Sequence, residues 1–177
     1  MRFINYYLKL HQKVGQEMRI AEIVEKYTHY LEERGFRIVQ KEDQRPWGGY
    51  FVIDEAQASE FMQTFFADQE LAHDGKLSPK ILLVAPGKRL SWQYHHRRSE
   101  VWKCLDGAVR VTISSDDTQS MAQELHPGEV IRIEQGVRHR LEGLEDWGVV
   151  AEIWQHTDPE HPSDEDDIVR LQDDFGR

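Results

Sequence analysis

The first part of the chain has the hydrophobic pattern of an amphipathic helix. Between residues 17 and 34, apolar residues recur at spacings of three and four with charged residues between them. This pattern predicts a helix that packs on its own domain or on a partner subunit, and Gly35 follows where a left-handed helix cap belongs. The sequence of residues 56–67 predicts a second, short helix that buries Phe61 and Phe65. The apolar positions of the first helix are Ile20, Ile23, Val24, Tyr27 and Leu31.

The pattern changes to short strands after Pro79. Six β-rich runs follow one another: ILLVA, LSWQY, EVWKCL, AVRVTI, EVIRI and WGVVAEIW. Turn signals such as PGK, DG and QG separate them, and this spacing predicts an antiparallel sandwich or barrel. Residues 36–39 and 50–53 also have strand character, whereas residues 68–78 read as a polar loop. We expect the acidic tail, residues 157–177, to wrap the barrel, because its apolar residues would otherwise be exposed.

These patterns predict two parts of the chain. Residues 1–44 form an N-terminal helical extension, and residues 45–177 form a barrel with a C-terminal tail. A chain of 177 residues is long enough to bury a sizeable core. The predicted class is therefore mainly β, with one helical extension.

Composition narrows the possible partners. The net charge of −10 disfavours general binding to nucleic acid, whose phosphates attract clustered Lys and Arg. The single cysteine, Cys104, excludes an internal disulfide and a thiolate metal cluster. The first residues contain no apolar run suited to a signal peptide or a membrane span, so we expect a cytoplasmic protein without a membrane partner. A local group of basic residues still allows an anionic small substrate: Arg97, Arg98, Arg138 and Arg140.

Four residues have the spacing of a metal site. Gln93 and His95 are two apart in a strand, so their side chains point to the same face. Glu100 follows after a turn that would bring the next strand alongside, and His139 comes from a separate segment after a turn at Gly136. Two imidazoles, a carboxylate and an amide oxygen suit a divalent ion, with zinc as first choice and manganese, iron, cobalt or nickel as alternatives. Four protein ligands leave a coordination position open, which a catalytic metal needs.

The sequence around these residues resembles known motifs. Residues 87–107 resemble the first cupin motif, and residues 128–139 resemble the second. More narrowly, the chain resembles the type II phosphomannose isomerase family, the cupin unit at the C-terminus of bifunctional mannose-1-phosphate guanylyltransferases. Four stretches support this resemblance: PWGGY (46–50), PGKRLSWQYHHRRSEVW (86–102), HRLEG (139–143) and EDDIVRLQDDFGR (165–177).

The resemblance implies a fold and an activity. It implies a cupin barrel, an RmlC-like jelly roll, and a metal-dependent isomerase that interconverts an aldose and a ketose. The implied substrate is mannose-6-phosphate or a related hexose or heptose phosphate. The catalytic base stays unassigned, with Lys80 and His96 as candidates. The expected phosphate-binding residues are Lys80, Arg98, Arg140 and Arg177.

Three departures from the family pattern leave other functions open. Val101 stands where the family usually has His, Glu134 replaces a Pro, and Gly143 replaces a common Asn. The alternatives are a non-catalytic sugar-binding cupin and another metal-dependent cupin enzyme, such as an oxygenase. We do not expect guanylyl transfer, because the sequence has no Gly-rich nucleotide-binding loop. We expect a homodimer, paired through edge strands or through the N-terminal helix.

Overall fold

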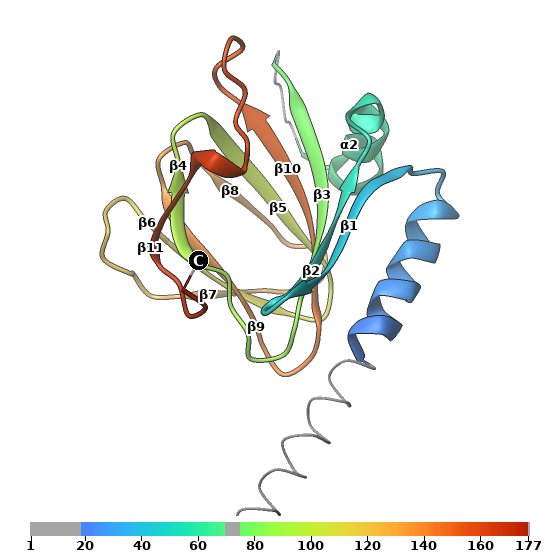
Figure 1. Cartoon of the computed structure of the whole chain (residues 1–177), viewed down its shortest axis with the longest axis horizontal. Coiled ribbons are helices and arrows are strands. Elements are labelled where there is room, and N and C mark those ends of the chain that lie inside the picture. Colours follow the sequence, from blue (N-terminus) through green and yellow to red (C-terminus); the bar gives the residue numbers. More distant parts are fainter. Residues whose placement is uncertain (1–18, 70–74, 177) are drawn as a thin grey trace, which may run out of the picture.

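The computed structural model describes residues 19–69 and 75–176, and it contains two helices on one side of a β sandwich (Figure 1). The first helix covers residues 19–32. It ends with a bond from the Phe36 N–H to the Leu31 carbonyl, 3.0 Å long, as the predicted cap requires. The second, α2 (Ala58–Phe66), buries Phe61 and Phe65 as predicted. No helix of the described residues is long and apolar enough to cross a membrane.

All strand pairs of the described chain are antiparallel, and they form two sheets. The six-stranded sheet has the order β1 (Ile38–Arg45), β2 (Gly48–Ile53), β3 (Leu77–Val84), β10 (Gly148–His156), β5 (Arg98–Asp106) and β8 (Val130–Ile133). The five-stranded sheet has the order β11 (Ile168–Gln172), β4 (Trp92–His95), β9 (Arg138–Gly143), β6 (Val109–Ser114) and β7 (Gln123–Leu125). Two short 3-10 helices, η1 (Glu55–Gln57) and η2 (Glu165–Asp167), complete the structure. The predicted mainly β class is confirmed.

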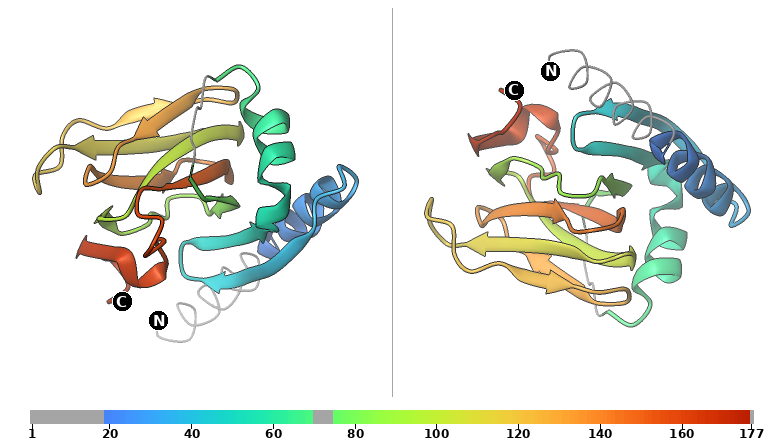
Figure 2. Two further views of the ribbon diagram at one scale, coloured as in Figure 1. Left: turned by 90° about the horizontal axis from the view of Figure 1, so that it is seen from above. Right: turned by 90° about the horizontal axis from the view of Figure 1, so that it is seen from below.

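The hydrophobic core has two layers, one on each face of the six-stranded sheet. Successive residues of β3 point in opposite directions, because side chains alternate along a strand. Leu82 faces the space between the sheets, where it joins Trp102 and Leu141. Leu83 faces outward and packs in the same cluster as Leu31 of the first helix. The N-terminal helix therefore packs on its own domain, and Figure 2 shows both helices on the same side of the molecule.

Both ends of the described chain add strands to the barrel. β1 begins at Ile38, which pairs with Ile53 of β2, so this strand runs across the division predicted after residue 44. β11 pairs with β4 and places Ile168 opposite His95. The tail thus wraps the barrel, as predicted. The strands β7, β9 and β11 were not among the predicted runs, and β3 begins at Leu77, inside the predicted loop.

Candidate metal centre and pocket

Three of the four predicted metal ligands meet between the two sheets. His95 ends β4, His139 lies on β9 beside it, and Glu100 comes from β5 of the facing sheet. Their donor atoms all lie within 4.8 Å of one another. Each of the three side chains is almost completely buried. A turn with Gly136 at a φ of 78° leads into β9, as the sequence indicates.

The hydrogen bonds around the two imidazoles suit a bound cation. His139 Nδ1 lies 2.9 Å from the Val137 carbonyl, so it donates there and Nε2 keeps its lone pair. Arg98 Nη2 donates to His95 Nε2 over 3.1 Å, so this nitrogen is also an acceptor. The two Nε2 atoms face each other at 3.2 Å, and His95 Nε2 is 3.2 Å from Glu100 Oε1. Lone pairs that converge in this way repel one another. The Arg98 guanidinium offsets part of this repulsion, and a divalent metal held among the three donor atoms would offset the rest, so the residues fit such an ion.

The protonation states also suit metal binding. Burial lowers the pKa of His139 to about 4, so its imidazole is neutral at physiological pH. Burial alone would raise the pKa of Glu100, but the positive charge of Arg98 lowers it well below its usual range. Metal ligands bind as neutral imidazole and ionised carboxylate. At neutral pH, His139 and Glu100 are therefore in the forms that a metal requires.

Gln93 lies beside the cluster with its amide nitrogen toward it. Its Nε2 is 3.4 Å from His95 Nε2, while its Oε1 accepts a hydrogen bond of 2.5 Å from the Ser91 hydroxyl. Metal ligation through the oxygen requires the amide group to rotate by half a turn. The amide nitrogen and oxygen are similar in size, so the rotated amide fits the same space. Gln93 as fourth ligand stays a proposal.

Arg98 is held entirely by protein partners. Its Nε donates to Glu100 Oε1 over 2.7 Å, and its Nη1 donates to the Ser163 hydroxyl over 2.9 Å. The guanidinium also stacks on Trp154, 3.5 Å from the ring centroid. Arg98 therefore orients the carboxylate of Glu100 and ties β5 to the C-terminal segment.

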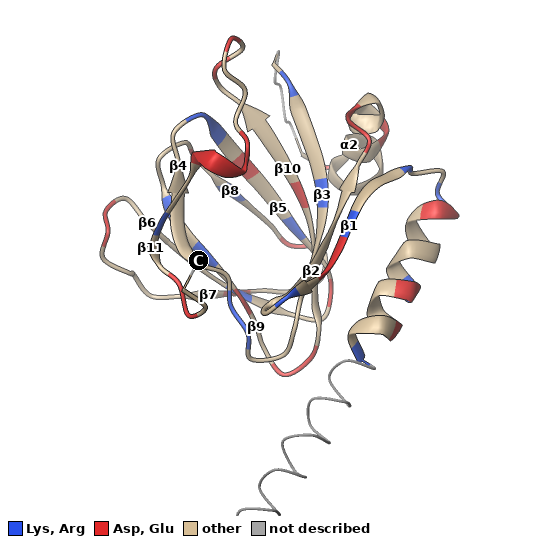
Figure 3. Cartoon of the chain, in the orientation of Figure 1, with Lys and Arg blue, Asp and Glu red and all other residues tan. Residues whose placement is uncertain are grey.

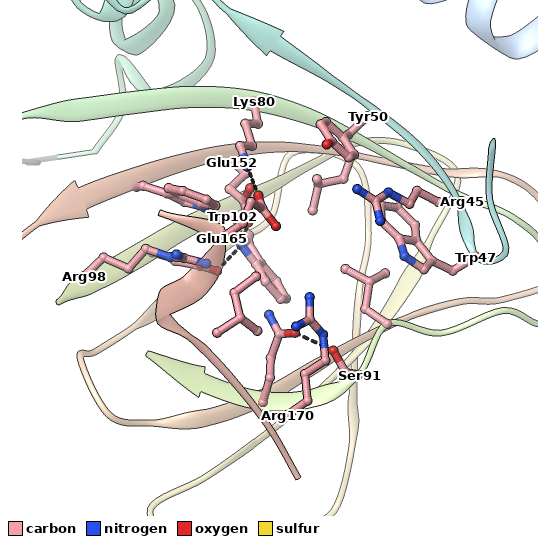
Figure 4. Close-up of a pocket in the computed structure, with 16 residues that line it drawn as sticks. Arg45, Trp47, Tyr50, Lys80, Ser91, Arg98, Trp102, Glu152, Glu165 and Arg170 are labelled. Atoms are coloured by element: carbon pink, nitrogen blue, oxygen red, sulfur yellow. Dashed lines mark hydrogen bonds and ion pairs between the residues drawn. The ribbon is translucent and has the colours of Figure 1, made fainter. Parts of the chain in front are cut away.

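A pocket of about 570 Å³, including its part open to solvent, adjoins the metal cluster (Figure 4). Gln93 and Glu100 form the wall next to the histidines. The other lining residues are Arg45, Trp47, Tyr50, Lys80, Leu82, Leu90, Ser91, Arg98, Trp102, Glu152, Trp154, Glu165, Ile168 and Arg170. The pocket therefore combines Glu100 of the cluster with several other charged and aromatic side chains.

Glu152 is a buried carboxyl that the sequence reasoning missed. Its Oε1 accepts a hydrogen bond of 2.9 Å from the Trp102 indole, whose N–H also lies 3.1 Å from Glu100 Oε2. Burial and then the charge of Glu100 raise the pKa of Glu152 to about 8. By contrast, Glu165 pairs with Lys80 Nζ at 2.9 Å. A lone Glu inside the apolar run GVVAEIW was the sequence signal for this group.

The remaining predicted site residues lie apart from the pocket lining. Arg140 follows His139 on β9 and so points to the opposite face, where it donates to the Gln172 carbonyl over 3.2 Å. His96 is exposed, with its ring 5.1 Å from that of Tyr94. Arg177 lies outside the described residues. Of the predicted phosphate and catalytic residues, the structure thus brings Lys80 and Arg98 into the pocket.

The family of the chain follows from its match to a family model. The model described as mannose-6-phosphate isomerase C-terminal matches residues 32–173. The chain belongs to this family. A mannose-1-phosphate guanylyltransferase of Salmonella montevideo is 30% identical over 158 residues, which cover 89% of this chain and 28% of the relative. The xanthan biosynthesis protein XanB of Xanthomonas campestris (strain B100) is 28% identical, over 93% of this chain and 30% of its own length.

This member of the mannose-6-phosphate isomerase C-terminal family spans under a third of the length of these two relatives. Among solved structures, a mutant of Bacillus subtilis oxalate decarboxylase resembles this chain with a TM-score of 0.54 and 14% identity. The match covers 75% of this chain and 30% of that protein. This likeness supports the cupin fold alone.

The three departures from the family pattern lie outside the pocket lining. Val101 has the opposite strand parity to Glu100 and packs in the outer core beneath the helices. Glu134 is exposed. Gly143 packs against the backbone of Ala85, and a Cβ at this glycine would lie 2.3 Å from the Ala85 carbonyl oxygen. The departures therefore reflect packing and surface positions.

We expect Gly143→Asn to destabilise the protein, although Asn is common in the family at this position. The added side chain would collide with backbone, which moves less readily than a side chain, and the cost of such overpacking is roughly 1–3 kcal/mol. Urea unfolding would measure it. The exposed Glu134→Pro, which also restores a family residue, is the control, and equal stability of Gly143→Asn and the parent would contradict the explanation from packing.

Proposed function

We propose that this protein is a metal-dependent sugar-phosphate isomerase of the mannose-6-phosphate type, acting on that sugar phosphate or on a related hexose or heptose phosphate. One observation supports this most: the His95, Glu100 and His139 cluster adjoins a pocket that contains a second buried carboxyl, Glu152. Membership of the mannose-6-phosphate isomerase C-terminal family supports the substrate class.

The chemistry of the reaction matches these parts. Exchange between aldose and ketose moves a proton between adjacent carbons through an enediol, and charge develops on the neighbouring oxygens. A divalent ion bound by the cluster, with Gln93 as proposed fourth ligand, would polarise those oxygens. Zinc remains our first choice, with manganese, iron, cobalt or nickel as alternatives.

Glu152 is the group that we assign to proton transfer. Within residues 19–69 and 75–176 it forms no ion pair, whereas Glu100 is a proposed metal ligand paired with Arg98, and Glu165 is neutralised by Lys80. The Trp102 N–H holds its carboxyl next to that of Glu100. A positioned, buried carboxyl beside the reacting carbons is suited to removing and returning a proton. Lys80 remains the second candidate in the pocket.

The test is an assay of a purified, metal-loaded protein. Metal content is measured first, and a panel of hexose, pentose and heptose phosphates is then offered in both directions. We expect interconversion of mannose-6-phosphate and fructose-6-phosphate, or of a closely related pair. An absence of turnover with every member of the panel, at full metal occupancy, would contradict the proposal.

The homodimer and the cytoplasmic location expected from the sequence stay predictions. β1 and β8 are the two edges of the six-stranded sheet in the described chain. Edge strands present unpaired N–H and C=O groups to which another chain can bind. We propose that a second copy pairs along one of these edges.

A further inference from the structure

Two arginines that the sequence reasoning did not select face the pocket. Arg45 is the last residue of β1, and Arg170 lies on β11. Figure 4 shows both guanidinium groups directed into the pocket, separate from the Lys80–Glu165 pair. Both side chains line the pocket. These arginines come from the first and the last strand of the described chain.

Neither arginine has a close ion pair of the kind that Lys80 and Arg98 form. The Nε atom of each is buried and has no hydrogen-bond partner. Among the described residues Arg170 forms no ion pair, and the ion pair of Arg45 with Glu42 is long, at 3.8 Å. Burying an unpaired polar group costs free energy. A bound anion would supply the missing acceptors.

The surrounding charge makes this pair unusual for the chain. The protein has a net charge of −10, and Figure 3 shows acidic residues along the first helix and on η2. Inside the pocket, Lys80 is matched by Glu165 and Arg98 by Glu100. The other two cations that line the pocket are Arg45 and Arg170. A pocket in which Arg170 forms no ion pair with the described residues, and Arg45 only the long one with Glu42, attracts an anion despite the acidic surface.

The register places Arg170 next to the metal cluster. Arg170 is directly opposite Gln93 in the pairing of β11 with β4, and opposed residues of an antiparallel pair project to the same face. Arg45 stands at the mouth of the pocket, with 35% of its side chain exposed and its guanidinium 5.7 Å from the Tyr50 ring centroid. The two arginines thus form a wall that reaches from the Gln93 side to the entrance.

We propose that Arg45 and Arg170 form a binding site for a phosphate monoester. The planar guanidinium presents paired N–H donors that match phosphate oxygens, and two of them can neutralise a dianion. This assignment rests on the proposed function: the site takes the phosphate end of the substrate, while the sugar carbons extend toward Glu100 and Glu152. Lys80 and Arg98 then serve the reacting end, because their charges are already paired.

Binding to the metal-free 177-residue chain tests this site without any turnover. Isothermal titration compares inorganic phosphate, a hexose 6-phosphate and the same hexose without phosphate. We expect the two phosphates to bind and the hexose to bind far more weakly. Arg170→Met and Arg45→Met should each weaken phosphate binding about tenfold or more, the effect of losing one charge-assisted contact. Arg170→Lys keeps the positive charge but loses the paired N–H donors of the guanidinium. Its affinity for phosphate should therefore lie between those of the parent and Arg170→Met.

The matched control is Arg110→Met, because Arg110 pairs with Glu124 and Glu142 on β7 and β9, outside the pocket lining. It should bind phosphate like the parent, and thermal melts establish that each variant is folded. Unchanged affinity in both Arg45→Met and Arg170→Met would overturn the site, even where the parent isomerises a sugar phosphate. Weakened binding in both, in a protein without isomerase turnover, would uphold the site and count against the proposed function.

Discussion

His139→Ala is expected to lose its bound metal while the protein stays folded. The substitution removes one of three donors that converge within 4.8 Å. Loss of residues that merely orient a ligand lowers metal affinity about 10–100-fold, so loss of the ligand itself should exceed this range. The β9 backbone keeps its pairing with β4 and β6, so far-UV circular dichroism should be unchanged. Metal content after dialysis, determined by elemental analysis, measures the effect.

The control for this experiment is His96→Ala. His96 is adjacent to a ligand in sequence but exposed, so its removal should leave the metal stoichiometry as in the parent. A folded His139→Ala protein that retained one equivalent of metal would refute the ligand set.

Glu152→Gln is expected to lower the turnover number about 10²–10⁴-fold, the usual contribution of a general acid or base. The amide keeps the shape of the carboxyl, and its oxygen can still accept the hydrogen bond from Trp102. It cannot take up a proton at neutral pH. Metal content should stay at the level of the parent, because Glu152 is not among the clustered ligand atoms. Steady-state kinetics, together with deuterium incorporation at the reacting carbon in heavy water, measure the loss.

Two comparison variants separate the possible outcomes. Glu124→Gln changes an exposed carboxylate on β7 and should leave turnover unchanged. Lys80→Met removes the other candidate for proton transfer from the pocket. If Glu152→Gln were fully active and metal-loaded Lys80→Met were inactive, Lys80 rather than Glu152 would be assigned as the group that transfers the proton.

Several features follow from the sequence because their signals are local. A 3.6-residue period defines the helix over residues 19–32, and strand parity places Glu100 and Trp102 on one face. The indole of Trp102 and the carboxylate of Glu100 both line the pocket in the structure. The three clustered candidates for metal binding, His95, Glu100 and His139, could likewise be selected from spacing and motif. Such signals extend over a few residues, so they do not depend on how distant segments pair.

The tertiary structure decided which other side chains lie near this cluster. Arg170 reaches the pocket because β11 pairs with β4, an association of segments about 75 residues apart whose register the sequence does not reveal. Glu152 became a site residue through its position beside Trp102 on the neighbouring strand. Arg140 faces away from His139 because successive residues of β9 alternate between faces. By itself the sequence determined the local elements and the likeness to the family, whereas the pairing of distant strands determined the pocket beside the predicted ligands.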